Sequence, residues 1–199
     1  MNRHQVQDMM QLMASRIKAI ADDISDEEVS YFIQELLDAK RIYVMGAGRS
    51  GLVAKAFAMR LMHLGMISYV VGETITPALQ NGDLIVVLSG SGRTRTIMEI
   101  VQTAKEIGGR ISLITSNPDS PIGKISDTLV IIENFRDSIP DESKEYDTRQ
   151  MLGEHRSFAP LGTLFETAAM TFCDAVISRL MEITQTDESA LKDRHANIE

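Results

Sequence analysis

Several features that define common classes of protein are scarce in this sequence. Its 199 residues contain one cysteine, Cys173, which excludes an intramolecular disulfide and is typical of a reducing compartment. No apolar run reaches the roughly 18 residues that a membrane-spanning helix needs, and the first residues lack the apolar core of a signal peptide. We therefore expect a cytoplasmic protein with no membrane partner.

Positive charge is also scarce. The chain has 20 Lys and Arg residues against 28 Asp and Glu residues, which gives a formal net charge of −8. Nucleic acids and anionic membrane surfaces bind basic faces of proteins, so this balance argues against both as main partners. The four histidines include no pair with the spacing of metal ligands, and we expect no metal site.

Apolar runs without polar alternation occur through the middle of the chain, between segments with helical periodicity. Such runs predict strands that are covered on both faces, and therefore a parallel sheet in a layered α/β domain. The expected strands are 41–45, 67–71, 83–88, 111–115 and 128–132, with helices at 50–64 and 94–107 and a short helix near 121–125.

The flanking segments complete the predicted domain, which we expect to be single over residues 1–199. Residues 1–40 have the periodicity of two helices, and residues 161–181 that of a long, buried helix followed by a polar tail. Residues 133–160 are polar, contain two prolines, and predict a long loop, which in a compact domain is often functional.

Two short stretches rich in glycine each follow an apolar run and open a helical segment. They read Gly46-Ala47-Gly48-Arg49-Ser50-Gly51 and Ser89-Gly90-Ser91-Gly92-Arg93-Thr94. A helix N-terminus presents unpaired N–H groups and partial positive charge, and glycine lets an anion approach the backbone closely. These stretches predict a site for a phosphorylated small molecule, with Gly48, Arg49, Ser50, Ser89, Ser91, Arg93 and Thr94 as candidate ligands.

Other interpretations of the two stretches remain open. The first matches the G-x-G-x-x-G pattern of dinucleotide sites, with Glu73 as a possible ribose ligand, but the pattern alone is weak and leaves the second stretch unexplained. The second stretch lacks the Gly-Lys-Ser/Thr ending of an NTPase loop. Both could be ordinary strand-to-helix turns, although such turns need no comparable density of hydroxyls.

Glu166 is the candidate acid–base group, and it lies one turn into the last long helix. Its apolar neighbours disfavour a charged carboxylate, an environment suited to proton transfer. The alternative is a glutamate that complements the helix dipole, which the residues alone favour. Cys173 lies in an apolar segment and is expected to be buried and structural.

Taken together, these motifs resemble the SIS (sugar isomerase) domain family. The resemblance rests on both glycine-rich stretches, on Pro160-Leu161-Gly162-Thr163-Leu164-Phe165-Glu166 and on Arg194-His195-Ala196-Asn197, and it covers essentially the whole chain. It implies a three-layer, flavodoxin-like sandwich around a five-stranded parallel sheet. It also implies a homotetramer that needs no metal or organic cofactor.

The last two motifs resemble those of isomerases that interconvert D-arabino-3-hexulose 6-phosphate and fructose 6-phosphate in formaldehyde fixation by the ribulose monophosphate pathway. The resemblance implies Glu166 as the base that acts through an enediol. It makes His195, from its own or a neighbouring subunit, a candidate for proton transfer between oxygens. The alternative is a SIS module that binds a sugar phosphate as a regulatory signal. Such regulators usually carry a helix-turn-helix domain, for which residues 1–40 are short.

Overall fold

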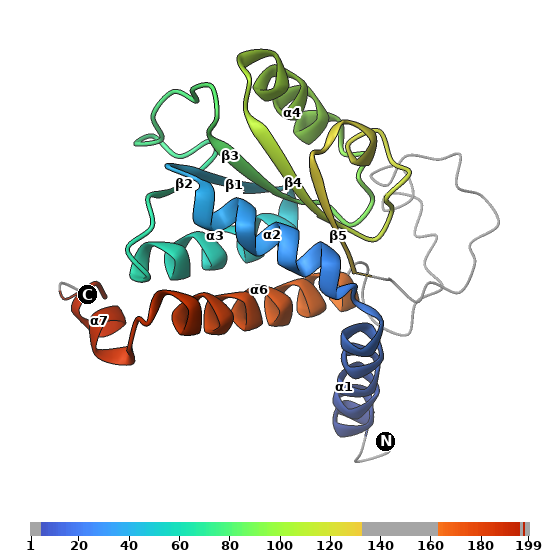
Figure 1. Cartoon of the computed structure of the whole chain (residues 1–199). Helices are drawn as coiled ribbons and strands as arrows, with labels where there is room; N and C mark the ends of the chain where they lie inside the picture. Colours follow the sequence, from blue (N-terminus) through green and yellow to red (C-terminus); the bar gives the residue numbers. More distant parts are fainter. Residues whose placement is uncertain (1–4, 133–162, 196, 198–199) are drawn as a thin grey trace.

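Five parallel strands form one sheet in the order β2-β1-β3-β4-β5. The computed structural model describes residues 5–132, 163–195 and 197 (Figure 1). The strands are β1 (Ile42–Gly46), β2 (Ser68–Val70), β3 (Leu84–Leu88), β4 (Arg110–Thr115) and β5 (Thr128–Ile131). The helices are α1 (Gln5–Asp23), α2 (Asp26–Asp38), α3 (Gly48–His63), α4 (Arg95–Ile107), the 3-10 turn η1 (Gly123–Ile125), α6 (Thr163–Thr184) and α7 (Glu188–Asp193).

The fold class predicted from the apolar runs is confirmed, because each expected strand pairs in parallel with its neighbours. Side chains alternate between the two faces of the sheet, and both faces are covered. Ile42 and Val44 point into a core shared with α2, α3 and α6, whereas Tyr43 and Met45 point into a second core shared with α4. Figure 1 shows α4 on one side of the sheet and α2, α3 and α6 on the other.

The strand order places the two glycine-rich stretches side by side. From β1 the chain passes through α3 to β2 at one edge, and from β3 it passes through α4 to β4 on the other side. β1 and β3 are adjacent, and Gly46 at the end of β1 is in register with Leu88 at the end of β3. Ligands of open α/β sheets bind at this kind of topological switch point, beyond the carboxyl ends of the strands.

The C-terminal part of the chain holds more helix than the sequence predicts. The predicted polar tail contains a short helix, α7, and α6 extends to Thr184. The second of the two helices expected in residues 1–40, α2, is capped by the Ser25 hydroxyl, which accepts a hydrogen bond from the Glu28 N–H at 3.3 Å. The long loop expected at 133–160 lies outside the described residues. No helix in the described part of the chain has the length and apolar content needed to cross a membrane.

The larger core depends on aromatic side chains that join α2, α3 and α6. Phe32 of α2 lies 6.4 Å from Phe57 of α3 and 5.8 Å from Phe172 of α6, measured between ring centroids. Phe57 is buried to 1% exposure. Contacts between these rings hold α2, α3 and α6 together on one face of the sheet, where the first turn of α6 also lies.

We predict that Phe57→Ala lowers the free energy of unfolding by about 3–5 kcal/mol, because it removes a buried ring and leaves a cavity. Urea unfolding followed by circular dichroism measures the change. Gln102→Ala, at an exposed position on α4, is the control and should change the free energy by less than about 0.5 kcal/mol. Equal losses in the two variants would contradict the role given to Phe57.

Candidate active site

The first glycine-rich stretch, residues 46–51 (the glycine loop), brings the end of β1 into close contact with the start of α3. A Cβ atom at Gly46 would lie 2.7 Å from the backbone carbon of Ser50, and one at Gly51 would lie 2.7 Å from the Gly46 oxygen. Gly48 has a φ of +56°, which side-chain-bearing residues rarely adopt. The glycines therefore set the main-chain path, and Ser50 is buried within it.

Helices α3 and α4 both begin without a side-chain cap. Their N-cap residues, Ala47 and Thr94, are extended, and within the described residues neither makes a side-chain capping hydrogen bond. The N–H groups of the first turn are left for another acceptor. Because both helices start at the carboxyl edge of the sheet, two positive helix ends converge on one place.

In the second stretch, residues 89–94 (the serine loop), two hydroxyls organise the loop itself. The Ser89 Oγ accepts a hydrogen bond from the Gly92 N–H at 3.2 Å, and the Ser91 Oγ accepts one from the Arg93 N–H at 3.3 Å. A hydroxyl that accepts a bond in this way still has its own O–H to donate. Ser89 is buried, whereas Arg93 is exposed. This arrangement is compatible with donation to a phosphate oxygen.

The start of α6 packs directly on the serine loop. A Cβ atom at Gly90 would lie 3.0 Å from the Phe165 ring, so any side chain there would crowd the ring. The next residue, Glu166, is buried to 7% exposure, and its Oε2 lies 3.5 Å from the Nε of Arg49 in the glycine loop. The structure thus brings Glu166 together with both loops.

The burial of Glu166 bears on its alternative interpretation. A glutamate that only complements a helix dipole needs no burial, because the effect also operates at an exposed helix end. A buried carboxylate loses hydration, and its charge must be compensated by its surroundings. Arg49, whose side chain is 58% exposed, supplies a positive charge on one side and leaves donors facing solvent.

In the folded chain, His195 lies away from Glu166 and from the two glycine-rich loops. Its ring stacks on that of His63 with 4.9 Å between centroids, at the C-terminal end of α3. Both rings line a pocket of about 400 Å³ together with Ile177 of α6. The α6 residue of this pocket nearest to Glu166 along the helix is Asp174, roughly 12 Å away at a helical rise of about 1.5 Å per residue. Within one chain, His195 does not join Glu166 and the loops.

The stacked histidines pack in a positively charged environment. Burial lowers the pKa of His63, and the neighbouring His195 and Arg60 lower it further. The Arg194 guanidinium donates a hydrogen bond to the His63 carbonyl oxygen at 3.2 Å. Within the polar tail that follows α6, residues 188–195 thus include α7 and make these contacts with α3.

Other residues singled out in the sequence have local partners. Glu73 pairs with Lys55 of α3. Cys173 is buried as expected, and burial raises the pKa of its thiol far above the ordinary value. Among the described residues, no group of three or more His, Cys, Asp and Glu side chains is arranged to hold a metal ion.

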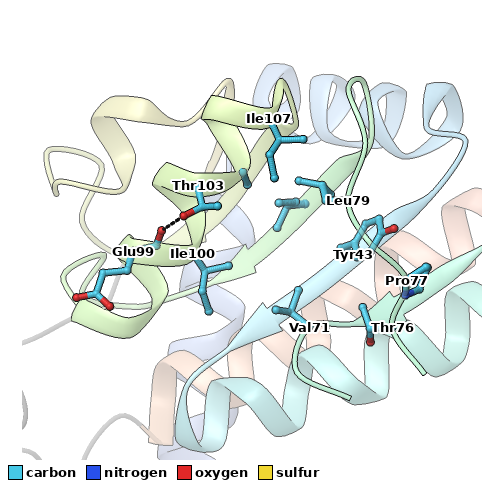
Figure 2. A pocket seen from close by; sticks show the side chains of 11 residues that line it. Tyr43, Val71, Thr76, Pro77, Leu79, Glu99, Ile100, Thr103 and Ile107 are labelled. Carbon is cyan, nitrogen blue, oxygen red and sulfur yellow. Dashed lines mark hydrogen bonds between the residues drawn. The ribbon is translucent and has the colours of Figure 1, made fainter. Parts of the chain in front are cut away.

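A separate apolar groove lies beside α4, on the other face of the sheet (Figure 2). Its volume is about 350 Å³, and its lining includes Tyr43, Val71, Pro77, Leu79, Ile100 and Ile107. No residue of the glycine loop or the serine loop lines it. The groove offers little for recognition of a phosphorylated molecule and is distinct from the site at the carboxyl edge.

The sequence reasoning missed the residues beneath the serine loop. The Ser116 hydroxyl donates to the Gly90 carbonyl oxygen at 2.7 Å, and Ser120 is fully buried against Gly92. Their position directly after β4 is the signal that was available, because the end of this strand lies at the same edge of the sheet as the loops.

The chain belongs to the SIS domain family, whose model matches residues 35–138. A likeness in fold and sequence also extends to solved structures. The structure of a protein from Methanococcus jannaschii has a TM-score of 0.78 and 32% identity, and the match covers 96% of this chain and 99% of that one. For that protein, a molecular function of 3-hexulose-6-phosphate isomerase has been inferred from its structure.

Curated relatives match over nearly the whole chain. The 3-hexulose-6-phosphate isomerase of Bacillus subtilis is 40% identical over 88% of this chain and 89% of its own length. The protein of the same name from Mycobacterium gastri is 37% identical over 96% of this chain and 89% of its own length. Within the SIS family, the chain is thus similar to full-length sugar-phosphate isomerases.

We predict that Ser89→Ala weakens the binding of fructose 6-phosphate by about threefold to tenfold, because one neutral hydrogen-bond donor is lost. Isothermal titration calorimetry measures the dissociation constant. Unphosphorylated fructose is the control ligand and should bind too weakly to detect. If the wild-type protein bound fructose and fructose 6-phosphate equally well, the assignment of a phosphate site to these loops would be wrong.

Proposed function

We propose that the protein is a 3-hexulose-6-phosphate isomerase that interconverts D-arabino-3-hexulose 6-phosphate and fructose 6-phosphate. The observation that carries the proposal is the buried Glu166 carboxylate, 3.5 Å from Arg49 and packed beside the serine loop through Phe165. The full-length likeness to isomerases of that name supports the choice of substrate. Isomerisation of a phosphorylated sugar needs at least a base that removes the carbon-bound proton and a neighbouring loop that binds the phosphate anion.

The proposed reaction moves a carbonyl group between neighbouring carbons. Glu166 takes the proton from C2 of the 3-hexulose, and the C–H electron pair forms the C2–C3 double bond of an enediol as the C3 oxygen gains negative charge. A proton then passes from the C2 hydroxyl to the C3 oxygen. Glu166 returns its proton to C3 as the double-bond electron pair shifts to that carbon, and the C2–O bond becomes the new carbonyl. Arg49 and the Ser50 hydroxyl are the nearest candidates to stabilise the oxyanion, because their donors lie beside the carboxylate or in the same loop.

The phosphate anchors the sugar in this scheme. The serine loop and the N-terminal ends of α3 and α4 supply hydroxyls and main-chain N–H groups for the phosphate oxygens, through Ser89, Ser91 and Thr94. Arg93 is exposed beside them and adds positive charge at the rim. Gly48 keeps the main chain of the glycine loop open to the ligand.

The proposal includes a homotetramer in which His195 of a neighbouring subunit transfers the proton between the substrate oxygens. Two observations support a second copy of the chain. In its own subunit, His195 lines a pocket whose α6 residues begin roughly two helical turns from Glu166, and α1 exposes the apolar Val6 and Met10. In the cell, we place the enzyme in the cytoplasm and in formaldehyde fixation by the ribulose monophosphate pathway.

Glu166→Gln tests the proposal directly. We predict a loss of turnover of about a hundredfold or more, because an amide cannot accept the carbon-bound proton. Binding of fructose 6-phosphate should change little, since the lost interaction belongs to the transition state. Proton–deuterium exchange at carbon, measured by NMR on fructose 6-phosphate in deuterated water, reports the step in both proteins.

Glu182→Gln is the matched control, because Glu182 lies on the same helix and is exposed. It should leave exchange unchanged. Normal exchange in Glu166→Gln would remove Glu166 from the mechanism. Tight binding of fructose 6-phosphate by the wild-type protein with no exchange at all would instead support the regulatory module.

We also predict that Arg49→Lys lowers kcat/KM by about tenfold. Lysine keeps the positive charge but not the planar fork of donors that can serve both Glu166 and a sugar oxygen. Steady-state kinetics measures the effect, with Arg95→Lys as the control, because Arg95 pairs only with the exposed Glu99 among the interactions described. Unchanged kinetics in Arg49→Lys would place Arg49 outside the site.

A further inference from the structure

The carbonyl oxygen of Gly90, in the middle of the serine loop, is held by the segment that follows β4. The Ser116 hydroxyl donates to it at 2.7 Å, the Ser116 N–H at 3.1 Å and the Thr115 hydroxyl at 3.3 Å. A carbonyl oxygen has two lone pairs, so two hydrogen-bond donors are enough to satisfy it. The Gly90 oxygen has three donors within hydrogen-bond distance. The orientation of this one peptide group is therefore strongly determined.

The orientation of the Gly90 carbonyl determines that of the next N–H group. In a planar trans peptide, the carbonyl of one residue and the N–H of the next point in opposite directions. With the Gly90 oxygen directed at Ser116, the Ser91 N–H must point away from the segment after β4. Among the described residues, no acceptor forms a hydrogen bond with this N–H.

The same segment supports the rest of the loop from below. A Cβ atom at Gly92 would lie 1.9 Å from the Ser120 Oγ, so the loop rests directly on this buried serine. The Ser120 hydroxyl accepts from the Gly123 N–H at 3.1 Å, and the Ile122 N–H donates to the Gly92 carbonyl at 3.2 Å. The loop is thus fixed at Gly90 and at Gly92, on either side of Ser91.

We propose that Ser116 is a positioning residue, which sets affinity for the phosphate group by orienting the Gly90–Ser91 peptide so that the Ser91 N–H and the neighbouring hydroxyls converge on one anion. The inference rests on the proposed function in one respect, that a phosphate ester binds in the serine loop. Ser116 donates its hydroxyl and N–H to the protein main chain and acts through the loop.

Ser116→Ala removes the shortest of the three bonds, and Ser116→Thr keeps a hydroxyl at the same place. We expect Ser116→Ala to raise both the dissociation constant for inorganic phosphate and the KM for fructose 6-phosphate by about threefold to tenfold. We expect kcat to stay within about twofold of wild type, because Glu166 and Arg49 are untouched. Ser116→Thr should restore most of the affinity.

Ser68→Ala is the matched control. The Ser68 hydroxyl also donates to a distant main-chain carbonyl, that of Ala58, at 2.8 Å, but at the start of β2 and therefore at the opposite edge of the sheet. Melting temperatures of the two variants compare the structural cost of each lost bond. Ser68→Ala should leave phosphate affinity and KM unchanged.

The double variant Thr115→Val/Ser116→Ala strips both hydroxyls from the Gly90 oxygen and should weaken phosphate binding further than Ser116→Ala alone. Two results would overturn the inference and leave the isomerase proposal intact. One is a phosphate affinity of Ser116→Ala equal to that of Ser68→Ala. The other is a loss in the kcat of Ser116→Ala with KM unchanged. A wild-type protein that binds inorganic phosphate without isomerising the sugar would refute the isomerase proposal, and the phosphate affinities of the same variants would still decide the role of Ser116.

Discussion

The contact between Phe165 and Gly90 is the constraint on which the candidate site depends. It brings the start of α6 against the serine loop so closely that a Cβ atom at position 90 would lie 3.0 Å from the ring. Because Phe165 is almost fully buried, this contact belongs to the larger core and is held by the same packing that joins α2, α3 and α6. Burial of Glu166 is therefore a consequence of core packing and does not depend on a ligand.

A second constraint is the close approach of main chain to main chain at the end of β1. Gly46 and Gly51 leave no space for side chains where the strand meets α3, and this contact places Ser50 and Arg49 at the carboxyl edge beside Glu166. The guanidinium of Arg49 thus faces the buried Glu166 carboxylate from the neighbouring loop.

The site therefore combines rigid and exposed parts. Its candidate anion-binding groups are main-chain N–H groups and hydroxyls whose positions are set by buried neighbours such as Ser120, whereas Arg49 and Arg93 reach into solvent. Rigid donors lose little conformational entropy when a ligand binds. The His63–His195 stack lies at the other end of α6 and ties the chain end to α3, so the same helix spans two chemically distinct regions.

The sequence by itself determined the parallel sheet, both glycine-rich loops and the place of Glu166 in the first turn of a helix, because periodicity, glycine content and helix starts are local properties of the chain. It also carried the resemblance to the SIS family. Only the tertiary structure decided that Arg49 faces Glu166, that Ser116 holds Gly90, and that His195 stacks on His63. These pairings join segments far apart in the sequence, and they depend on strand order and helix packing. A hydrogen bond to a main-chain carbonyl has no sequence signature, because any nearby donor can make it.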